Sequence, residues 1–293
     1  MKSKGLKIAV LSGKGGTGKT LVSVNLAAVA EASVYVDCDA EEPNGHLFFK
    51  PEMVREEVVS VALPVVNESL CNGCRTCVDF CKFNALAFIK SKPLVFEEVC
   101  HSCGGCALLC PQKAIAEREK PVGRVLEGVS GPVRVHTGIM NTGQASGMPI
   151  VKRLLRDRLS DGARPVFVDC PPGSACLVME SIKDADYCLL VAEPTVFGAH
   201  DLGMVRELVA LFGKPHGVVL NKCLAGENPA EAFCRENHVP VVGRIPFDSE
   251  LGALNSDGGI AVRESERFRA MFSSLLETVM KEARHEAAVG PQR

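Results

Sequence analysis

Short apolar runs alternate with amphipathic stretches along most of this chain. The first run, Lys7–Leu11, ends in a glycine-rich turn, and residues 20–32 follow with the apolar spacing of a helix. A second apolar run at 33–36 leads into Asp37-Cys38-Asp39. This order of strand, helix and strand predicts a βαβ unit at the start of a parallel sheet.

The same alternation returns from residue 133 onward. Further strands are predicted at 133–136, 164–168, Tyr187–Ala192, 217–220 and 239–244, and a helix at 199–212. A closing helix is expected over 264–284, where the apolar residues are spaced to bury one face. These residues are Phe268, Met271, Phe272, Leu275, Leu276 and Val279. The prediction is an α/β fold with a doubly wound, mostly parallel sheet and helices on both faces.

Residues 63–118 interrupt this pattern. Short β-like stretches at 65–68, 85–90, 94–97 and 114–117 surround two cysteine runs, and each run is followed by a small-residue helical turn and a strand. This internal two-fold repeat predicts a small α+β domain over 63–118. It would be inserted into a larger domain made of residues 1–62 and 119–293.

Eight of the 14 cysteines form two identical C-x2-C-x2-C-x3-C runs. The first run is Cys71, Cys74, Cys77 and Cys81, and the second is Cys100, Cys103, Cys106 and Cys110, followed by Pro111. In this spacing three close cysteines bind one [4Fe–4S] cluster and the fourth reaches the other cluster. We therefore expect one cluster on Cys71, Cys74, Cys77 and Cys110, and a second on Cys81, Cys100, Cys103 and Cys106. Zinc is the alternative, although it usually takes two separated C-x2-C pairs. A purely structural role for the clusters is also open.

A phosphate-binding motif lies between the first strand and the first helix. It consists of Gly13, Lys14, Gly15, Gly16, Thr17, Gly18, Lys19 and Thr20, and fits G-x4-G-K-[ST]. The glycines let backbone N–H groups converge on phosphate oxygens, and the start of a helix favours negative charge. Lys19 is expected to contact the β- and γ-phosphates and the Thr20 hydroxyl to bind Mg²⁺. We expect the nucleotide-binding segment for ATP or ADP to extend through Leu21.

The extra lysine of this loop carries a family resemblance. The sequence GKGGTGKT resembles the deviant Walker A motif of the MinD/ParA/Mrp ATPases, a family that includes the nitrogenase iron protein. The resemblance implies that Lys14 reaches across a homodimer to the partner's nucleotide. It implies that Asp39 is the switch I aspartate that positions the attacking water, so Lys14, Lys19 and Asp39 form the catalytic set. It also implies that Asp169 holds Mg²⁺ through water.

The resemblance extends to the base-binding region and to one further cysteine. Asn221 resembles the asparagine that reads adenine, with a turn-forming role as the alternative, and Pro246 opens a loop that packs on the base. Cys176 lies seven residues after Asp169, where the nitrogenase iron protein has a cluster ligand. Because residues 138–147 contain no second cysteine, Cys176 is expected to be buried and structural, with a metal or redox role as the alternative.

The remaining cysteines and histidines give weaker signals. Ordinary buried positions are expected for Cys38, Cys170, Cys188, Cys223 and Cys234. His101 stands within the second cysteine run, where it is expected to face solvent or, alternatively, to tune a cluster.

Composition limits the classes of partner. The net charge is -2, there is no tryptophan and there are two tyrosines, so binding to nucleic acid is not expected. Residues 1–10 lack the features of a signal peptide, and residues 285–293 lack the apolar face of a membrane anchor. We expect a cytoplasmic protein, in which cysteines stay reduced.

The whole chain resembles MinD-type ATPases with an inserted ferredoxin domain of the bacterial two-cluster type. This resemblance implies a Mg²⁺-dependent ATPase whose nucleotide-dependent dimer closure drives electron transfer, or assembly of a metal or iron–sulfur cluster, on a redox or metallocluster-carrying partner. One alternative is a MinD- or ParA-like spatial regulator of cell division or segregation, in which the insert docks a partner or senses redox state. Another is an electron carrier that binds ATP with little turnover.

Overall fold

The computed structural model describes residues 5–156, 162, 164–226 and 228–289. Within these residues a nine-stranded sheet has the order β11-β10-β9-β1-β8-β2-β7-β6-β3. The strands are β1 (Lys7–Leu11), β2 (Val34–Asp37), β3 (Glu52–Val66), β6 (Ile115–Ser130), β7 (Val133–Met140), β8 (Val166–Asp169), β9 (Tyr187–Ala192), β10 (His216–Cys223) and β11 (Val241–Pro246). Neighbours from β11 to β7 run parallel, whereas β6 and β3 are antiparallel at one edge. The predicted mostly parallel α/β sheet is confirmed.

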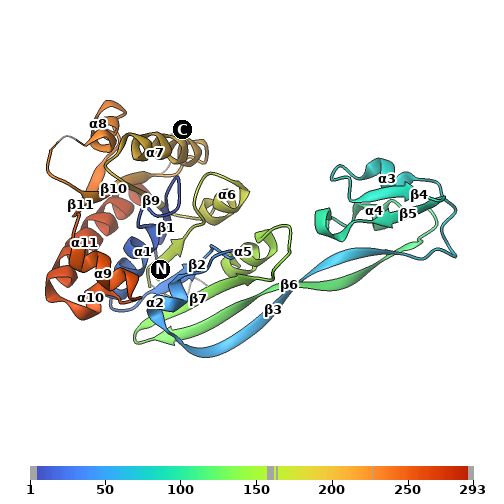
Figure 1. Ribbon diagram of the computed structural model, residues 1–293, viewed down its shortest axis with the longest axis horizontal. Coiled ribbons are helices and arrows are strands. Elements are labelled where there is room, and N and C mark those ends of the chain that lie inside the picture. The colour runs from blue at the N-terminus through green and yellow to red at the C-terminus, as the bar shows by residue number, and fades with distance from the viewer. Residues whose placement is uncertain (1–4, 157–161, 163, 227, 290–293) are drawn as a thin grey trace.

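Helices cover both faces of the sheet (Figure 1). One apolar layer is formed with α5 (Met148–Leu155), α6 (Cys176–Ile182), α7 (Val196–Leu211) and α8 (Pro229–Glu236). The opposite layer is formed with α1 (Lys19–Val29), α2 (Gly45–Phe49), α9 (Ser249–Ser256), α10 (Ala261–Glu264) and α11 (Glu266–Val289). The closing helix buries Phe268, Phe272 and Val279, as its spacing predicts.

Strands β3 and β6 form a long two-stranded ribbon that leaves the edge of the sheet (Figure 1). The sequence predicts only short strands at 65–68 and 114–117, but the structure has continuous strands of 15 and 16 residues. Residues 123–130 of β6 pair with β7, whereas 115–121 pair with β3 alone. Residues 116–119 are exposed. Because this run of exposed side chains covers no core, it lacks the alternation that identifies a strand.

The far end of the ribbon carries residues 67–114, here called the head; the remainder of the chain without the ribbon is the body (Figure 1). The head contains α3 (Thr76–Phe80), β4 (Leu86–Ile89), β5 (Lys92–Val95), a short 3-10 turn (Glu97–Val99) and α4 (Gly105–Leu108). Its small apolar cluster includes Cys77, Leu86 and Cys106. The ribbon strands run unbroken through positions 63 and 118, and the division into two domains stays a prediction.

In the part of the chain that the structure describes, no helix is both long enough and apolar enough to cross a membrane. Residues 1–4 and 290–293, which belong to the terminal segments considered above for targeting and anchoring, lie outside the described residues.

Candidate nucleotide site and cysteine centres

The phosphate loop joins β1 to α1, and three of its four glycines, Gly13, Gly16 and Gly18, are required by backbone conformation or by close packing. Gly16 and Gly18 have left-handed φ values of +80° and +90°, a region that favours glycine. A Cβ atom at Gly13 would lie 2.5 Å from the carbonyl oxygen of Asp201, and one at Gly18 would lie 2.1 Å from Nδ2 of Asn221. The loop therefore depends on glycine for close packing as well as for access to phosphate.

A buried ion pair lies beneath this loop. The Lys19 ammonium binds Oδ1 of Asp169, and the Tyr35 hydroxyl donates a hydrogen bond of 2.8 Å to Oδ2 of the same carboxylate. Burial opposes the charge of Lys19, but Asp169 outweighs it and the pKa of Lys19 is raised. The sequence reasoning missed Tyr35. A signal existed, because Tyr35 stands two residues before Asp37 and shares its face of the strand.

Asp37 and Asp39 occupy different environments after β2. Asp37 is buried, and its Oδ2 accepts hydrogen bonds from the backbone N–H groups of Asn44 and Gly45 at 3.0 and 2.8 Å. Burial and the charge of Asp169 raise the pKa of Asp37 to about 7. Asp39 is half-buried, and burial raises its pKa too. Asp37 therefore fixes the turn, and Asp39 remains the more accessible carboxylate.

Glu193 holds two lysines at the rim of the loop. The Lys14 ammonium lies 3.2 Å from its Oε2, and the Lys222 ammonium lies 2.6 Å from its Oε1. Lys222 also donates to the carbonyl oxygen of Gly16 at 2.8 Å. Burial opposes the charged form of Glu193, but the two lysines outweigh it and lower its pKa. Gly15 and Gly16 are exposed beside them. Neither Glu193 nor Lys222 is part of the sequence prediction.

The remaining loop positions differ in their contacts. Asn221 is buried, and its side-chain amide donates to the carbonyl oxygen of Thr17 at 2.7 Å, so it supports the loop directly. The Lys19 ammonium lies 3.5 Å from the Thr20 hydroxyl. Leu21 packs against the apolar core, so it offers nucleotide no polar side-chain contact.

Residues 246–248 lie at the carboxyl end of β11. The phosphate loop follows the carboxyl end of β1, on the same side of the parallel sheet. Pro246 ends β11, and the Phe247 side chain after it is 62% exposed. Asp248 caps α9 by accepting hydrogen bonds from the N–H groups of Glu250 and Leu251. An exposed aromatic ring is thus held on a capped helix start beside the predicted base-binding position.

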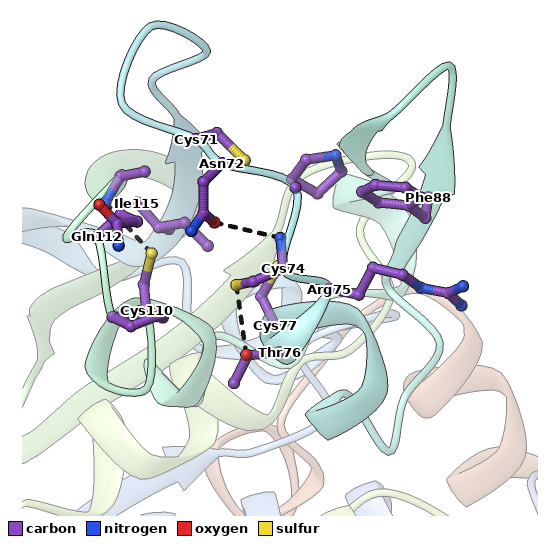
Figure 2. A pocket seen from close by; sticks show the side chains of 14 residues that line it. Cys71, Asn72, Cys74, Arg75, Thr76, Cys77, Phe88, Cys110, Gln112 and Ile115 are labelled. Carbon is purple, nitrogen blue, oxygen red and sulfur yellow. Dashed lines mark hydrogen bonds between the residues drawn. The ribbon is translucent and has the colours of Figure 1, made fainter.

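The head sorts its cysteines into two cavities. Figure 2 shows the first, which is lined by Cys71, Cys74, Cys77 and Cys110. The second is lined by Cys81, Cys100, Cys103 and Cys106. Each cavity therefore receives three cysteines from one run and one from the other, which is the crossed arrangement expected from the spacing.

The donor chemistry of these cavities fits an iron–sulfur cluster. Within the described residues, no group of three or more His, Cys, Asp or Glu side chains could hold a metal ion as a compact site. A [4Fe–4S] cluster binds each thiolate through a different iron, so its ligands surround a cavity instead of meeting at one ion. Four soft thiolates around each cavity suit such a cluster.

A cleft of about 760 Å³ borders the second cavity. Its lining includes the ribbon, head residues Cys100 and His101, and Lys152 of α5. The exposed His101 ring stacks on Phe83, with centroids 3.8 Å apart and planes 11° apart. The solvent-facing position expected for His101 thus includes an aromatic contact.

Cysteines outside the two runs are mostly buried. Cys38, Cys170, Cys188 and Cys234 are buried and Cys223 is half-buried. Cys176 is exposed, so the expectation that it is buried is wrong. Cys176 is exposed because it is the first residue of α6 and precedes the part of the helix that packs on the core.

Comparison with known proteins gives matches over most of the chain. Residues 8–260 match the family described as the CobQ/CobB/MinD/ParA nucleotide binding domain. An uncharacterized protein of Methanocaldococcus jannaschii is 32% identical, over 85% of this chain and 87% of its own length. An iron-sulfur cluster carrier protein of Methanococcus maripaludis is 24% identical, over 94% of this chain and 86% of its own length.

Solved structures share the fold. The cell division ATPase MinD of Pyrococcus furiosus aligns with a TM-score of 0.59 at 20% identity, over 94% of this chain and 99% of that chain. The septum site-determining protein MinD of Pyrococcus horikoshii, complexed with Mg-ADP, aligns with a TM-score of 0.60 at 18% identity, over 95% and 97% of the two chains. At these identities the likeness concerns the fold.

Proposed function

The chain belongs to the CobQ/CobB/MinD/ParA family of nucleotide-binding proteins, and on this basis we propose that it is a Mg²⁺-dependent ATPase whose nucleotide state acts on an iron–sulfur head. The phosphate loop binds ATP through backbone N–H groups and Lys19. Two copies of the chain close on nucleotide as a homodimer. The head then engages a redox or metallocluster-carrying protein, either for electron transfer or for cluster assembly.

The sorting of eight cysteines into two cavities carries this proposal. Each cavity takes three cysteines from one run and one from the other, and this crossing is typical of two-cluster iron–sulfur proteins. When bound, such clusters exchange single electrons. Similarity to a protein named as an iron-sulfur cluster carrier supports the same assignment.

Hydrolysis requires two lysines to change partners. Lys14 leaves Glu193 and reaches the nucleotide of the second copy, where its charge stabilises the transferring phosphoryl group. Lys19 turns from Asp169 to the β- and γ-phosphates. Asp169 then holds Mg²⁺ through water, and the half-buried Asp39 positions the attacking water. Asn221 supports the loop beneath the nucleotide.

Iron analysis and electron paramagnetic resonance test the proposal. Anaerobically purified protein should contain about eight irons per chain, and its dithionite-reduced spectrum should change when MgATP is added. Cys77→Ser should remove iron, whereas Cys223→Ser, outside both cavities, should not. Zinc in place of iron would overturn the assignment of the head. Clusters that do not respond to MgATP, in a protein that hydrolyses it, would overturn the coupling.

A further inference from the structure

Tyr35 connects the nucleotide site to the segment between α2 and the start of the ribbon. Its side chain is fully buried, and its hydroxyl donates to Oδ2 of Asp169 at 2.8 Å. Its ring packs against the ring of Phe49, with centroids 4.9 Å apart. Phe49 is the last residue of α2, and β3 begins three residues later. One side chain thus contacts both the Asp169 carboxylate and the segment that starts the ribbon.

Phe49 is in turn joined to the other ribbon strand. Its carbonyl oxygen accepts a hydrogen bond of 2.6 Å from the hydroxyl of Ser130, the last residue of β6. Arg263 donates to the Ser130 hydroxyl and carbonyl oxygen, both at 3.0 Å, and its guanidinium lies over the Phe49 ring, 5.6 Å from the centroid. Both strands of the ribbon are therefore anchored at one point.

The start of α2 is held against the same phenol. A Cβ atom at Gly45 would lie 2.2 Å from the Tyr35 ring and 2.4 Å from its hydroxyl oxygen, so only glycine allows this approach. The N–H of Gly45 donates to Asp37, and Asp37 pairs in register with Asp169 on β8. The short helix α2 thus lies between the nucleotide site and the ribbon, with contacts to both.

We propose that Tyr35 is a positioning residue: its hydroxyl holds the Asp169 carboxylate for Mg²⁺, and its ring links the position of that carboxylate to Phe49 and the base of the ribbon. The inference rests on the proposed function only in taking MgADP or MgATP as the ligand. It requires neither hydrolysis nor bound clusters.

Tyr35 holds Asp169 in place because Lys19 exchanges this carboxylate for phosphate when nucleotide binds. Contact with phosphate draws the lysine charge away from Asp169. The hydrogen bond from Tyr35 then keeps the buried carboxylate in place, since a buried carboxylate without a donor would be costly. Any shift of Asp169 toward Mg²⁺ moves the phenol and the ring packed against it.

Binding of ADP, measured with and without Mg²⁺, tests the first half of the proposal. Tyr35→Phe should leave the affinity for ADP alone unchanged and weaken the gain from Mg²⁺ about tenfold, as expected for losing a hydrogen bond to a charged group. The matched control is Tyr187→Phe, because the Tyr187 hydroxyl is buried with no hydrogen-bond partner among the described residues. A purely structural defect would weaken ADP with and without Mg²⁺ alike, and that result overturns the positioning role.

Hydrogen exchange tests the link to the ribbon. In the wild type, MgADP should change amide exchange at residues 49–53 and 128–131. Phe49→Leu and Ser130→Ala should keep the Mg²⁺ dependence of binding and lose this response. A wild type that binds MgADP without any change at the ribbon, or variants that retain the change, would overturn the link. A wild type that binds no MgADP would overturn this inference and the proposed function together, whereas normal binding with an unaltered Tyr35→Phe variant overturns only the role of Tyr35.

Discussion

The acidic side chains Asp169 and Glu193 each bind a lysine of the phosphate loop. Asp169 is paired with Lys19 and Glu193 with Lys14. The two pairs differ in cost, because the first is buried and the second is partly exposed. Breaking a buried pair leaves an uncompensated charge, so Lys19 leaves Asp169 only when a phosphate replaces the carboxylate as its partner. Lys14, by contrast, leaves Glu193 at little cost in free energy.

Lys14→Ala should separate binding from hydrolysis. Because Lys14 is 41% exposed and paired only at the rim, its loss should leave the affinity for ADP nearly unchanged. A charge supplied to the transferring phosphoryl group by a second copy is worth about a thousandfold in rate, and we expect a loss of that order. Turnover is measured against Lys152→Ala, which removes an exposed lysine of α5. A Lys14→Ala protein that turns over ATP at the wild-type rate would refute the trans role.

Asp37→Asn should stabilise the protein at high pH. Folding raises the pKa of Asp37 from 3.8 to about 7, so between these values the folded state binds the proton more tightly and stability falls as pH rises. Asparagine keeps an oxygen acceptor for the N–H groups of Asn44 and Gly45 but cannot ionise. We expect a gain above about 1 kcal/mol near pH 8 and a smaller gain near pH 5. Urea unfolding at both pH values measures it, and an equal gain at both would contradict the raised pKa.

At the scale of elements, a partly exposed ion pair adds to the contacts that fasten the ribbon to the body. Arg153 of α5 donates two hydrogen bonds of 2.6 Å to the carboxylate of Glu57 on β3. Such a two-point contact fixes orientation better than a single charge contact. These hydrogen bonds lower the pKa of Glu57, so the contact is present at neutral pH and is lost as the carboxylate protonates in acid.

Glu57→Gln should loosen α5 against the ribbon. We expect faster amide exchange in α5 and at residues 57–63, with a stability loss below about 1 kcal/mol because the pair is partly exposed. Glu56→Gln is the control, since Glu56 is more exposed and lies 3.6 Å from Arg124 in a single contact. Equal effects of the two substitutions would show that the Arg153 contact has no special part in holding the ribbon.

The sequence predicts the elements whose environment is uniform. Tyr187–Ala192 is buried along its whole length and Lys7–Leu11 at every residue after Lys7, so an apolar run identifies each strand with its bounds. The cysteine sets are predictable because ligand spacing constrains how the chain closes on itself. The ribbon is not, since exposed side chains at 116–119 interrupt the alternation along its outer part. Glu193 acts through partners far away in sequence, and no local pattern reveals such contacts. Tyr35 shares a strand face with Asp37, but its contact with Asp169 follows only from the pairing of β2 with β8.

At the scale of the whole molecule, the ribbon connects the head to the body, and its two strands stay paired up to the point where the head begins. Val66, the last residue of β3, pairs with Ile115, the first residue of β6. The head therefore leaves from and returns to two directly opposed positions. A hairpin turn has the same requirement for its two ends.

Replacing residues 67–114 with Asn-Gly should leave a folded body. A two-residue turn suits opposed antiparallel strands, and the body keeps both of its apolar layers. We expect affinity for MgADP within about twofold of the full chain, because the phosphate loop and its partners all lie in the body, and we expect no bound iron. Titration with ADP and iron analysis measure both. A soluble product that fails to bind MgADP would show that the head completes the nucleotide site.

The free part of the ribbon also acts as a lever arm. Within the sheet, residues 115–121 pair with β3 alone, and seven residues of strand span about 23 Å. A tilt of about ten degrees at the base of this segment would swing the head by about 4 Å, a little less than one spacing between strands. Small rearrangements at the sheet edge are thereby magnified at the cleft beside Cys100. The magnification is adjustable by evolution in steps of two residues per strand, because such steps shorten or lengthen the arm while every side chain keeps its face.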